Sequence, residues 1–405
     1  MIDAAAFHRD MTNVSAFGAT PDGGVCRLTA GKEDGAARDW FADRLKTEGF
    51  EIKVDAIGNM FGLARTAAPD APWLLTGSHL DSQPTGGKYD GAYGVIASLH
   101  AAIAAKREAG LTRNIAVVNW TNEEGARYQP SLMGSGVYTG ALALETALAA
   151  LDGDGVSMGE SLAAIGYAGK DAGPAPSAVA GYLEIHIEQG PALERAGRKI
   201  GVVTGNWGTA KYVVEFRGKA AHTGPTPMAE RRDALLPAAE LILAVRKLSD
   251  ETGGALLSSV GRLEVGPNSS NVVPETVTLF AELRDVDGAR LAKACEKFHA
   301  TIEALRGKGI EIKLRQTVDR KVADFDPGVR AAIAAAARAE GHEPLELRTV
   351  AGHDAVPVSA KVPTAMIFVP SRDGISHNAA EFTEPADLLI GTQVLARTLF
   401  DLARR

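Results

Sequence analysis

The sequence is poor in cysteine and has no membrane-length apolar run, no basic tract and no internal repeat. Its two cysteines, Cys26 and Cys295, are far apart and in no metal-binding spacing, so we expect reduced thiols in the cytoplasm rather than disulfides. The N-terminal residues lack the basic and apolar regions of a signal peptide. Together with a net charge of −7, these absences argue against nucleic acid and membranes as partners.

The length and composition are those of an ordinary folded protein. The chain has 405 residues, of which 45% are hydrophobic and 23% are charged. These proportions are typical of a chain with a packed core, and the length suits two domains.

Residues 77–94 form the stretch around which the rest of the chain is organised. They follow an apolar run that predicts a buried strand, and they precede a predicted helix. His79 and Asp81 therefore leave the carboxyl end of a strand, where ligands bind in open α/β sheets, and Asp90 lies in a Gly-rich turn. Imidazoles and carboxylates are ordinary ligands of divalent metals, and Asp81 is placed to accept the second ring N–H of His79. Taken alone, the stretch also fits a strand-end histidine and a solvated aspartate.

Other acids and histidines also follow predicted strands. The strand predicted at 114–120 runs into Glu123 and Glu124, whose side chains point different ways because they are neighbours. One of them can bind metal while the other acts as a general base, although solvated acidic turns are also common. His377 follows a strand predicted at 364–369.

Residues 181–191 alternate between apolar and polar side chains as a strand does. His186 shares one face of this strand with Glu184 and Glu188, so it is a candidate ligand with carboxylates beside it. A surface strand with its polar face outward is the alternative interpretation for Glu184.

Between residues 209 and 320 the order of predicted elements changes. Strand, helix, strand, strand, helix and strand follow one another, which is the split βαβ pattern. The first of these helices is expected to begin at about Arg231. We therefore predict an α/β protein in which a domain at 209–320 is inserted into a discontinuous domain at 1–208 and 321–405.

The candidate ligands together suit two divalent ions that share one carboxylate, that of Asp90. Two ions about 3.5–4 Å apart would stabilise both the attacking oxygen and the developing oxyanion. Glu123 would take a proton from water and deliver it to the leaving nitrogen. The five candidate ligands are His79, Asp90, Glu124, His186 and His377.

Five ordered motifs resemble those of the amidase, hydantoinase and carbamoylase branch of the M20 metallopeptidase family. That branch contains N-carbamoyl-L-amino acid hydrolases, allantoate amidohydrolases and β-ureidopropionases, and the resemblance covers nearly the whole chain. It implies a mixed-sheet, metallopeptidase-like catalytic domain with an inserted α+β lid and dimerisation domain, and hence a homodimer. The motifs are Gly77–Ser82, Gly87–Gly91, Asn122–Tyr128, Glu184–Pro191 and Ser376–His377.

The resemblance also implies how the two metal sites share Asp90. Glu123 would be the general acid and base, and Asp81 would support a ligand histidine. The first site would comprise His79, Asp90 and His186, and the second Asp90, Glu124 and His377.

The same resemblance implies which residues bind the substrate. Asn271 and Arg284 would hold its carboxylate, since a guanidinium can bind a carboxylate with two hydrogen bonds. His222 would contact the substrate or the oxyanion, either from the same subunit or from the neighbouring one. The remaining predicted contacts are Gln189, Gly352 and His353.

We expect a hydrolase that cleaves the ureido C–N bond of N-carbamoyl-L-amino acids, giving the amino acid, carbon dioxide and ammonia. Allantoate and N-carbamoyl-β-alanine are alternative ureido substrates, and an N-acyl amino acid deacylase or dipeptidase is the next class. A non-catalytic binding protein is the alternative outside enzymes, and the intact Glu123 and ligand set argue against it. The ligands suit zinc, manganese, cobalt or nickel alike.

Overall fold

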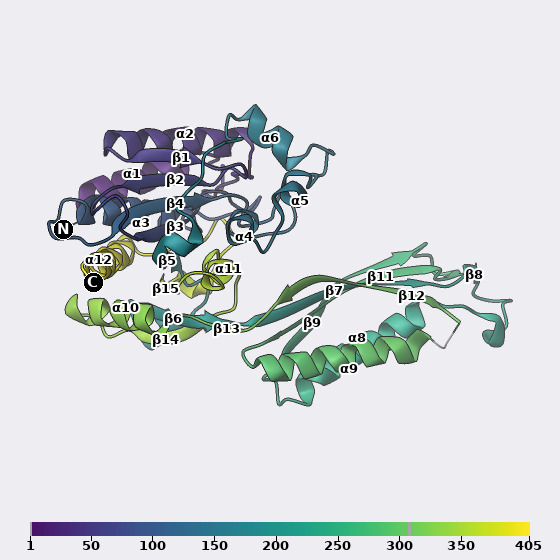
Figure 1. Cartoon of the computed structure of the whole chain (residues 1–405). Coiled ribbons are helices and arrows are strands. Elements are labelled where there is room, and N and C mark those ends of the chain that lie inside the picture. The colour runs from purple at the N-terminus through teal and green to yellow at the C-terminus, as the bar shows by residue number, and fades with distance from the viewer. Residues whose placement is uncertain (1, 307–308) are drawn as a thin grey trace. The chain divides into compact units, whose positions relative to one another are not determined.

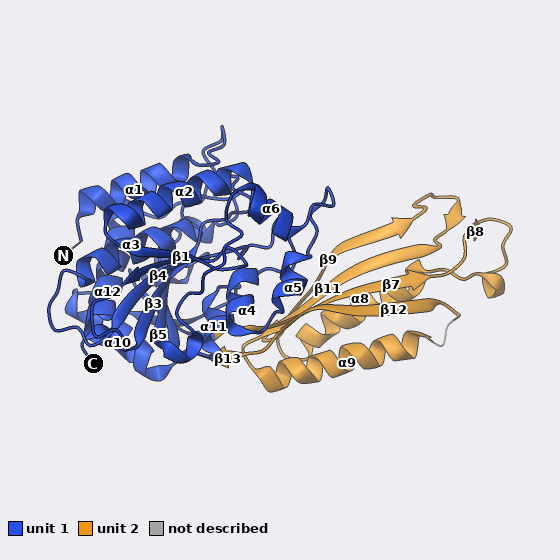
Figure 2. Cartoon of the chain, turned by 45° about the horizontal axis from the view of Figure 1, so that its top comes forward, with its two compact units in different colours: residues 1–205, 324–405 blue, residues 206–323 orange. Residues whose placement is uncertain are grey.

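The chain folds into two compact units in the computed structural model, which describes residues 2–306 and 309–405. Unit 1 comprises residues 1–205 and 324–405, and unit 2 comprises residues 206–323 (Figure 2). The sequence-based boundaries, at 208 and 321, lie close to these limits. None of the helices in the described ranges combines the length and the apolar character that a membrane span needs.

Unit 1 is built on a mixed sheet of nine strands. Their order is β1-β2-β4-β3-β5-β15-β6-β13, with β14 beside β6 (Figure 1). The adjacent strands β4, β3, β5 and β15 are parallel, so their carboxyl ends lie at the same edge of the sheet. The strands are β1 (Glu51–Val54), β2 (Met60–Ala64), β3 (Trp73–His79), β4 (Asn114–Trp120), β5 (Val179–Ile187), β6 (Gly201–Asn206), β13 (Ala323–Asp324), β14 (Leu345–Thr349) and β15 (Thr364–Val369).

Helices cover the central strands of unit 1. Strands β3, β4 and β15 are buried along their whole length, as parallel strands with helices on both faces are. Helices α3 and α12 pack against each other and against β3, while α11 packs against β5 and β15. The helices are α1 (Ala4–Ala16), α2 (Lys32–Thr47), α3 (Ala92–Ala105), α4 (Met133–Thr139), α5 (Leu144–Leu148), α6 (Met158–Ala164), α7 (Ala192–Ala196), α10 (Pro327–Ala339), α11 (Ala355–Ser359) and α12 (Pro385–Ala403), with 3-10 turns η1 (Pro176–Ala178) and η3 (Arg372–Gly374).

Unit 2 has a four-stranded antiparallel sheet in the order β12-β7-β11-β9. Its chain order has the predicted split βαβ pattern. The buried face of the sheet packs on two helices, and Tyr212 stacks on Phe298 with ring centroids 4.5 Å apart. The elements are β7 (Gly208–Arg217), β8 (Ala221–His222), η2 (Met228–Glu230), α8 (Leu235–Asp250), β9 (Leu257–Gly266), β10 (Val272–Val273), β11 (Thr276–Asp285), α9 (Gly288–Arg306) and β12 (Glu311–Arg320).

The α/β fold with a mixed main sheet and a separate antiparallel sheet is confirmed, with local differences from the prediction. Helix α8 begins at Leu235 rather than at about Arg231, because Arg232 pairs with Lys219 and the Asp233 carboxylate accepts the N–H of Leu235 at 2.9 Å. Strand β5 is central in the sheet, so its polar face is covered by protein instead of facing solvent. The sequence pattern does not predict α1, β6 or β14.

Candidate metal centre

The predicted ligands come from the carboxyl ends of neighbouring parallel strands. His79 is the last residue of β3, and His186 is the next-to-last residue of β5. Glu124 follows β4, His377 follows β15, and Asp90 directly precedes the first turn of α3. Because consecutive parallel strands end at one edge of the sheet, the topology brings all five side chains together.

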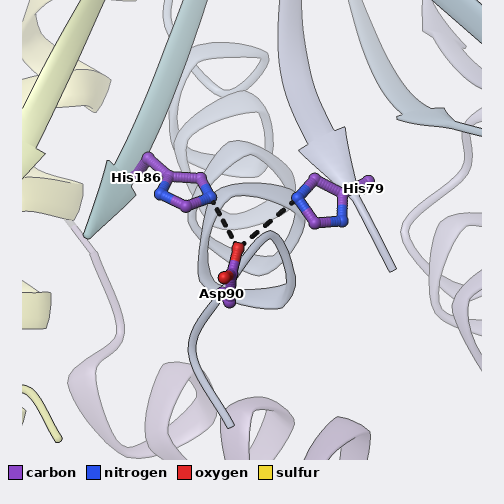
Figure 3. Close-up of side chains that lie close together, drawn as sticks. All are labelled: His79, Asp90 and His186. Atoms are coloured by element: carbon purple, nitrogen blue, oxygen red, sulfur yellow. Dashed lines mark ion pairs between the residues drawn. The ribbon is translucent and has the colours of Figure 1, made fainter. Parts of the chain in front are cut away.

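One candidate metal pocket is formed by His79, Asp90 and His186, whose ligand atoms all lie within 4.8 Å of one another. Nε2 of His186 is 3.1 Å from Oδ1 of Asp90, and Nε2 of His79 is 3.6 Å from the same oxygen. Figure 3 shows the two imidazoles reaching this carboxylate from two different strands. All three side chains are buried, so the pocket is shielded from water.

A second candidate pocket uses the other oxygen of Asp90. Nε2 of His377 lies 3.3 Å from Oδ2 of Asp90 and 3.5 Å from Oε2 of Glu124. The His377 side chain is 49% exposed, whereas the two carboxylates are buried. Asp90 therefore stands between the two pockets and offers one oxygen to each.

Glu123 lies beside the first pocket without belonging to either group of ligands. Its Oε2 is 3.6 Å from Nε2 of His79, and its side chain is 8% exposed. Glu123 is thus a carboxylate outside both ligand groups that contacts a candidate ligand. This is the position expected of the general base that the sequence predicts.

Main-chain oxygens fix the two buried histidine rings. Nδ1 of His79 is 2.9 Å from the carbonyl oxygen of Asp81, and Nδ1 of His186 is 2.9 Å from that of Ile187. With Nδ1–H donating to these carbonyls, Nε2 carries the lone pair that faces Asp90. The main chain of Asp81 thus makes the contact expected of its carboxylate, which lies 3.8 Å from the ring.

The carboxylate of Asp81 instead supports the two glutamates. It accepts the main-chain N–H of Glu123 at 3.2 Å and that of Glu124 at 3.3 Å, and the hydroxyl of Thr29 donates to it at 2.8 Å. Asp81 therefore joins the loop after β3 to the loop after β4, and both loops carry candidate functional residues.

The burial of several acids in one place sets the electrostatics of the site. Burial raises the pKa of Glu123 well above its ordinary value, and repulsion from neighbouring carboxylates adds to this shift. Burial and the charge of Asp90 raise the pKa of Glu124 to about 8. Burial would also raise the pKa of Asp90, but His186 and His377 hold it well below its usual range. A divalent cation would favour the ionised form of each of these carboxylates.

The residues present fit such a cation. Oε1 of Glu124 and Oε1 of Gln189 are buried and have no hydrogen-bond partner among the described residues. Because buried polar atoms normally have a partner, we expect a bound polar group or ion at this position. Gly91 has φ 64°, and a Cβ there would overlap the ring of His79. Imidazole nitrogens and carboxylate oxygens that converge in this way are typical ligands of borderline divalent metals.

The other residues predicted in unit 1 also lie next to the ligands. Nε2 of Gln189 donates to Oδ2 of Asp90 at 2.8 Å. The buried ring of His353 packs edge-on against that of His186, with centroids 4.6 Å apart, and Gly352 directly precedes it. Gln189 and His353 therefore contact candidate metal ligands directly.

Three further side chains contact the ligands although the sequence analysis assigns them no role. Gln83 donates to Oε2 of Glu124 at 2.9 Å. The one hydroxyl hydrogen of Ser376 is shared between Oδ2 of Asp90 at 3.1 Å and Oε2 of Glu381 at 2.8 Å. Oε1 of Glu381 accepts the main-chain N–H groups of Tyr89 and Asp90. Gln83 directly follows the first motif and Ser376 lies inside the last one, which is a signal for them, but the sequence carries no comparable signal for Glu381.

The three substrate residues predicted in unit 2 lie at two ends of it. His222 is in β8, which lies at one end of the unit (Figure 1) and pairs with β10, and Asn271 directly precedes β10. β10 ends just before β11 begins at Thr276, whereas Arg284 is near the other end of β11, beside Glu282. Eight residue steps separate Thr276 from Arg284, which is about 26 Å along the strand at 3.3 Å per residue. Within one copy of unit 2, Arg284 is therefore far from the end of β11 that follows β10.

Comparison with known protein families gives one match over most of the chain. The model of the peptidase family M20/M25/M40 matches residues 75–401. A protein of Mycolicibacterium smegmatis is 44% identical over 95% of this chain and 91% of its own length. The N-carbamoyl-L-amino acid amidohydrolase of Geobacillus stearothermophilus is 33% identical over 100% of both chains. The allantoate amidohydrolase of Bacillus subtilis is 34% identical over 96% of this chain and 95% of its own length.

Solved structures agree with this match. An amidase of the hydantoinase/carbamoylase family from Burkholderia vietnamiensis has a TM-score of 0.89 at 39% identity, covering 100% of this chain and 98% of that one. AtUAH in complex with (S)-hydroxyglycine has a TM-score of 0.86 at 32% identity, covering 100% and 99%. A tripeptidase from Staphylococcus aureus, with a TM-score of 0.73 at 15% identity over the whole of both chains, shares the fold.

Proposed function

We propose, since the chain belongs to the peptidase family M20/M25/M40 and to its hydantoinase/carbamoylase amidohydrolase branch, that it hydrolyses the ureido C–N bond of N-carbamoyl-L-amino acids. The products would be the amino acid, carbon dioxide and ammonia. The observation that carries the proposal is the pair of histidine and carboxylate pockets that share Asp90 beside the free carboxylate of Glu123. Relatives named N-carbamoyl-L-amino acid amidohydrolase support this choice of substrate.

Divalent ions are the proposed cofactors. When bound, they supply Lewis-acid chemistry, which polarises a carbonyl and activates water as a nucleophile. The donor set suits zinc, manganese, cobalt or nickel. His79, Asp90 and His186 would hold one ion, and Asp90, Glu124 and His377 the other.

Glu123 is the proposed general base and acid. Its carboxylate is buried, and Asp81 holds its main-chain N–H at 3.2 Å, so both its backbone and its surroundings are fixed. It would take a proton from the attacking water and deliver it to the leaving nitrogen.

Allantoate is the second candidate substrate, because an allantoate amidohydrolase matches this chain about as well as the carbamoyl amino acid hydrolases do. N-carbamoyl-β-alanine has two carbons instead of one between nitrogen and carboxylate and carries no α side chain. N-acyl amino acids and dipeptides are the substrates of the next class. Each would offer a carboxylate and a scissile C–N bond to the same groups.

A homodimer is the proposed assembly, and a second copy of unit 2 is the proposed occupant of an apolar surface on it. Leu236 and Leu243 of α8 are 61% and 71% exposed and lie seven residues apart, on one face of the helix. β9 is an edge strand of the sheet, and its Leu257 and Leu263 are 45% and 40% exposed. An apolar helix face beside an open strand edge suits self-association around a two-fold axis.

The distance between Asn271 and Arg284 gives the dimer a role in the site. Within one unit 2, about 26 Å of β11 separates Arg284 from Thr276, at the end of the strand that follows Asn271 and β10. We infer that, if both residues hold one substrate carboxylate, they come from different subunits. We therefore assign Arg284 to one subunit of each site and Asn271, with His222, to its partner.

Ammonia release tests the proposed function. The protein would be loaded with Mn²⁺ or Zn²⁺ and given N-carbamoyl-L-amino acids, N-carbamoyl-β-alanine, allantoate, N-acyl amino acids and dipeptides in parallel. We expect the highest kcat/KM with an N-carbamoyl-L-amino acid and none after chelation. A preference for allantoate would make allantoate the proposed substrate, and the protein would still be a hydrolase of ureido compounds. Cleavage of only N-acyl amino acids or dipeptides would overturn the proposal.

A further inference from the structure

Glu381 is a buried carboxylate that lies next to both candidate pockets and is not among the predicted site residues. It follows His377 by four residues and is 4% exposed. Burial and the nearby charge of Asp90 raise its pKa to about 7. Among the described residues, its hydrogen bonds come from main-chain N–H groups and a serine hydroxyl, not from a basic side chain. A buried carboxylate that no basic side chain hydrogen-bonds is costly to retain, which points to a role beyond packing.

The two oxygens of Glu381 hold two different segments. Oε1 accepts the N–H of Tyr89 at 3.0 Å and that of Asp90 at 3.1 Å. Oε2 accepts the hydroxyl of Ser376 at 2.8 Å. A Cβ at position 87 would overlap the Glu381 side chain, so the approach of this carboxylate depends on Gly87. Glu381 therefore joins the loop that carries Asp90 to the loop that carries His377.

The contacts of Glu381 matter more for the second pocket than for the first. His79 and His186 of the first pocket sit on two paired central strands, and main-chain oxygens orient their rings. His377 is instead in a loop, has φ 54° and is half exposed. Its position relative to Oδ2 of Asp90 depends on contacts between loops, and Glu381 and Ser376 supply them.

We propose that Glu381 is a positioning residue that sets the metal affinity of the second pocket, formed by Asp90, Glu124 and His377. It acts by fixing the main chain of Asp90 and, through Ser376, the Asp90 oxygen that faces His377. The first pocket keeps its strand-borne histidines when Glu381 is removed. The inference rests on the two-ion site of the proposed function, so the test must separate the two.

The test is calorimetric titration of the chelator-treated full-length protein with Mn²⁺ alone, without substrate. The unsubstituted protein is expected to bind two ions per chain, and failure to do so would count against the proposed function itself. In Glu381→Ala, we expect the second ion to bind about 10–100-fold more weakly, as loss of a contact that supports a metal ligand does. The first ion should bind within about threefold of its original affinity, since its histidines are held by the sheet.

Matched variants distinguish positioning from general damage. Glu384→Ala removes an exposed glutamate of the same segment, paired with Arg372 at 2.7 Å, and should leave both affinities unchanged. Glu381→Gln keeps an acceptor for the main-chain N–H groups and should restore most of the lost affinity. If Glu381→Ala does not fold, Ser376→Ala decides, because it removes the link from Oε2 of Glu381 to Oδ2 of Asp90 and keeps the main-chain contacts of Oε1. Two normal affinities in Glu381→Ala, or an equal loss at both pockets in that variant, would overturn the proposal, and Ser376→Ala is judged in the same way where it takes its place.

Discussion

At the scale of single residues, the site depends on how one carboxylate is shared. Asp90 turns Oδ1 to His79 and His186 and Oδ2 to His377, so its two oxygens separate the pockets. Glu123 stands apart from both ligand groups. Ligand binding and proton transfer are thus assigned to different side chains, and substitutions can distinguish them.

Replacing Glu123 with glutamine tests the assigned proton transfer. The amide keeps the size of the side chain but cannot accept a proton, so kcat should fall by about 10²–10⁴-fold while KM and metal content change little. Steady-state kinetics and metal analysis of the purified variant check this. Glu160→Gln, at an exposed cap of α6, is the control and should be as active as the unsubstituted protein. Near-normal turnover in Glu123→Gln would remove Glu123 from its role.

Replacing Gly91 with alanine tests the close approach of the main chain to His79. The new Cβ would overlap the imidazole ring, and φ is 64°. Gly110→Ala is the matched control, since Gly110 has φ 77° but open space around its Cβ position. We expect the control to lose about 1–2 kcal/mol of stability from backbone strain alone, and Gly91→Ala to lose more and to bind the first ion poorly. Urea unfolding and metal titration measure both, and equal effects would show that the ring contact is unimportant.

At the scale of elements, the contact of α3 with the central strands holds the two histidine-bearing strands and the Asp90 turn together. Gly94 of α3 faces this contact, where a Cβ would come within 2.5 Å of the carbonyl oxygen of Ile185 and 2.6 Å of Cβ of Ser78. These neighbours belong to β5 and β3, the strands of His186 and His79. Helix and strands are therefore packed without spare room beside the site.

Gly94→Ala should separate α3 from these strands. We expect a loss of about 1–3 kcal/mol from overpacking, together with weaker binding of metal. Gly136→Ala, inside α4, is the control, because its Cβ would meet only Leu142 at 3.5 Å. There the better helix propensity of alanine should leave stability unchanged or raise it by up to about 1 kcal/mol. Calorimetric unfolding of both variants checks the difference, and a stabilised Gly94→Ala would contradict the packing argument.

At the scale of the whole molecule, the buried charges link stability to pH in the metal-free protein. The pKa of Glu124 is about 8 against an ordinary 4.5. Burial would lower the pKa of His186, but Asp90 raises it to about 9, and Asp90 raises the pKa of His377 to about 9 as well. Each raised pKa contributes stability below the unfolded value, and this contribution is lost as pH rises through the folded value.

The metal-free protein should therefore lose stability between about pH 5 and about pH 9. Bound divalent ions take the place of these protons, so the gain in Tm on adding Mn²⁺ should grow over the same range. Scanning calorimetry with and without Mn²⁺ at several pH values measures this gain. A gain that shrinks as pH rises would contradict the assigned electrostatics.

The proposed two-subunit site predicts complementation between inactive variants. Arg284→Ala and Asn271→Ala homodimers should each have strongly reduced kcat/KM. When the two are unfolded or dissociated and mixed, random pairing should restore about a quarter of the original activity, because half of the dimers then contain one intact site. Light scattering should show a monomer for Leu243→Glu and an unchanged dimer for Leu151→Glu, a substitution of an exposed leucine in unit 1. If mixing Arg284→Ala with Asn271→Ala restores no activity, each site takes both residues from one subunit or uses neither of them.

The sequence by itself determined the order of the main elements, the inserted unit and the residue types of the site. Apolar runs such as 73–76, 114–120 and 364–369 fall within strands, because buried parallel strands need apolar side chains on both faces. The histidines and acids that follow these runs were found for the same reason, since strand ends are where polar side chains leave the core. Local pattern therefore sufficed wherever a residue's role depends on its own strand or turn.

Only the tertiary structure decided which groups meet. It made the carbonyl oxygen of Asp81 the partner of the His79 ring. It directed the carboxylate of Asp81 to the main-chain N–H groups of Glu123 and Glu124. It placed Glu381 against a segment almost three hundred residues earlier in the chain. It put Asn271 beside the two-stranded sheet of β8 and β10, and Arg284 near the far end of β11 in the four-stranded sheet. Such contacts join segments that are distant in sequence, and their geometry follows from strand order and packing, which no local pattern encodes.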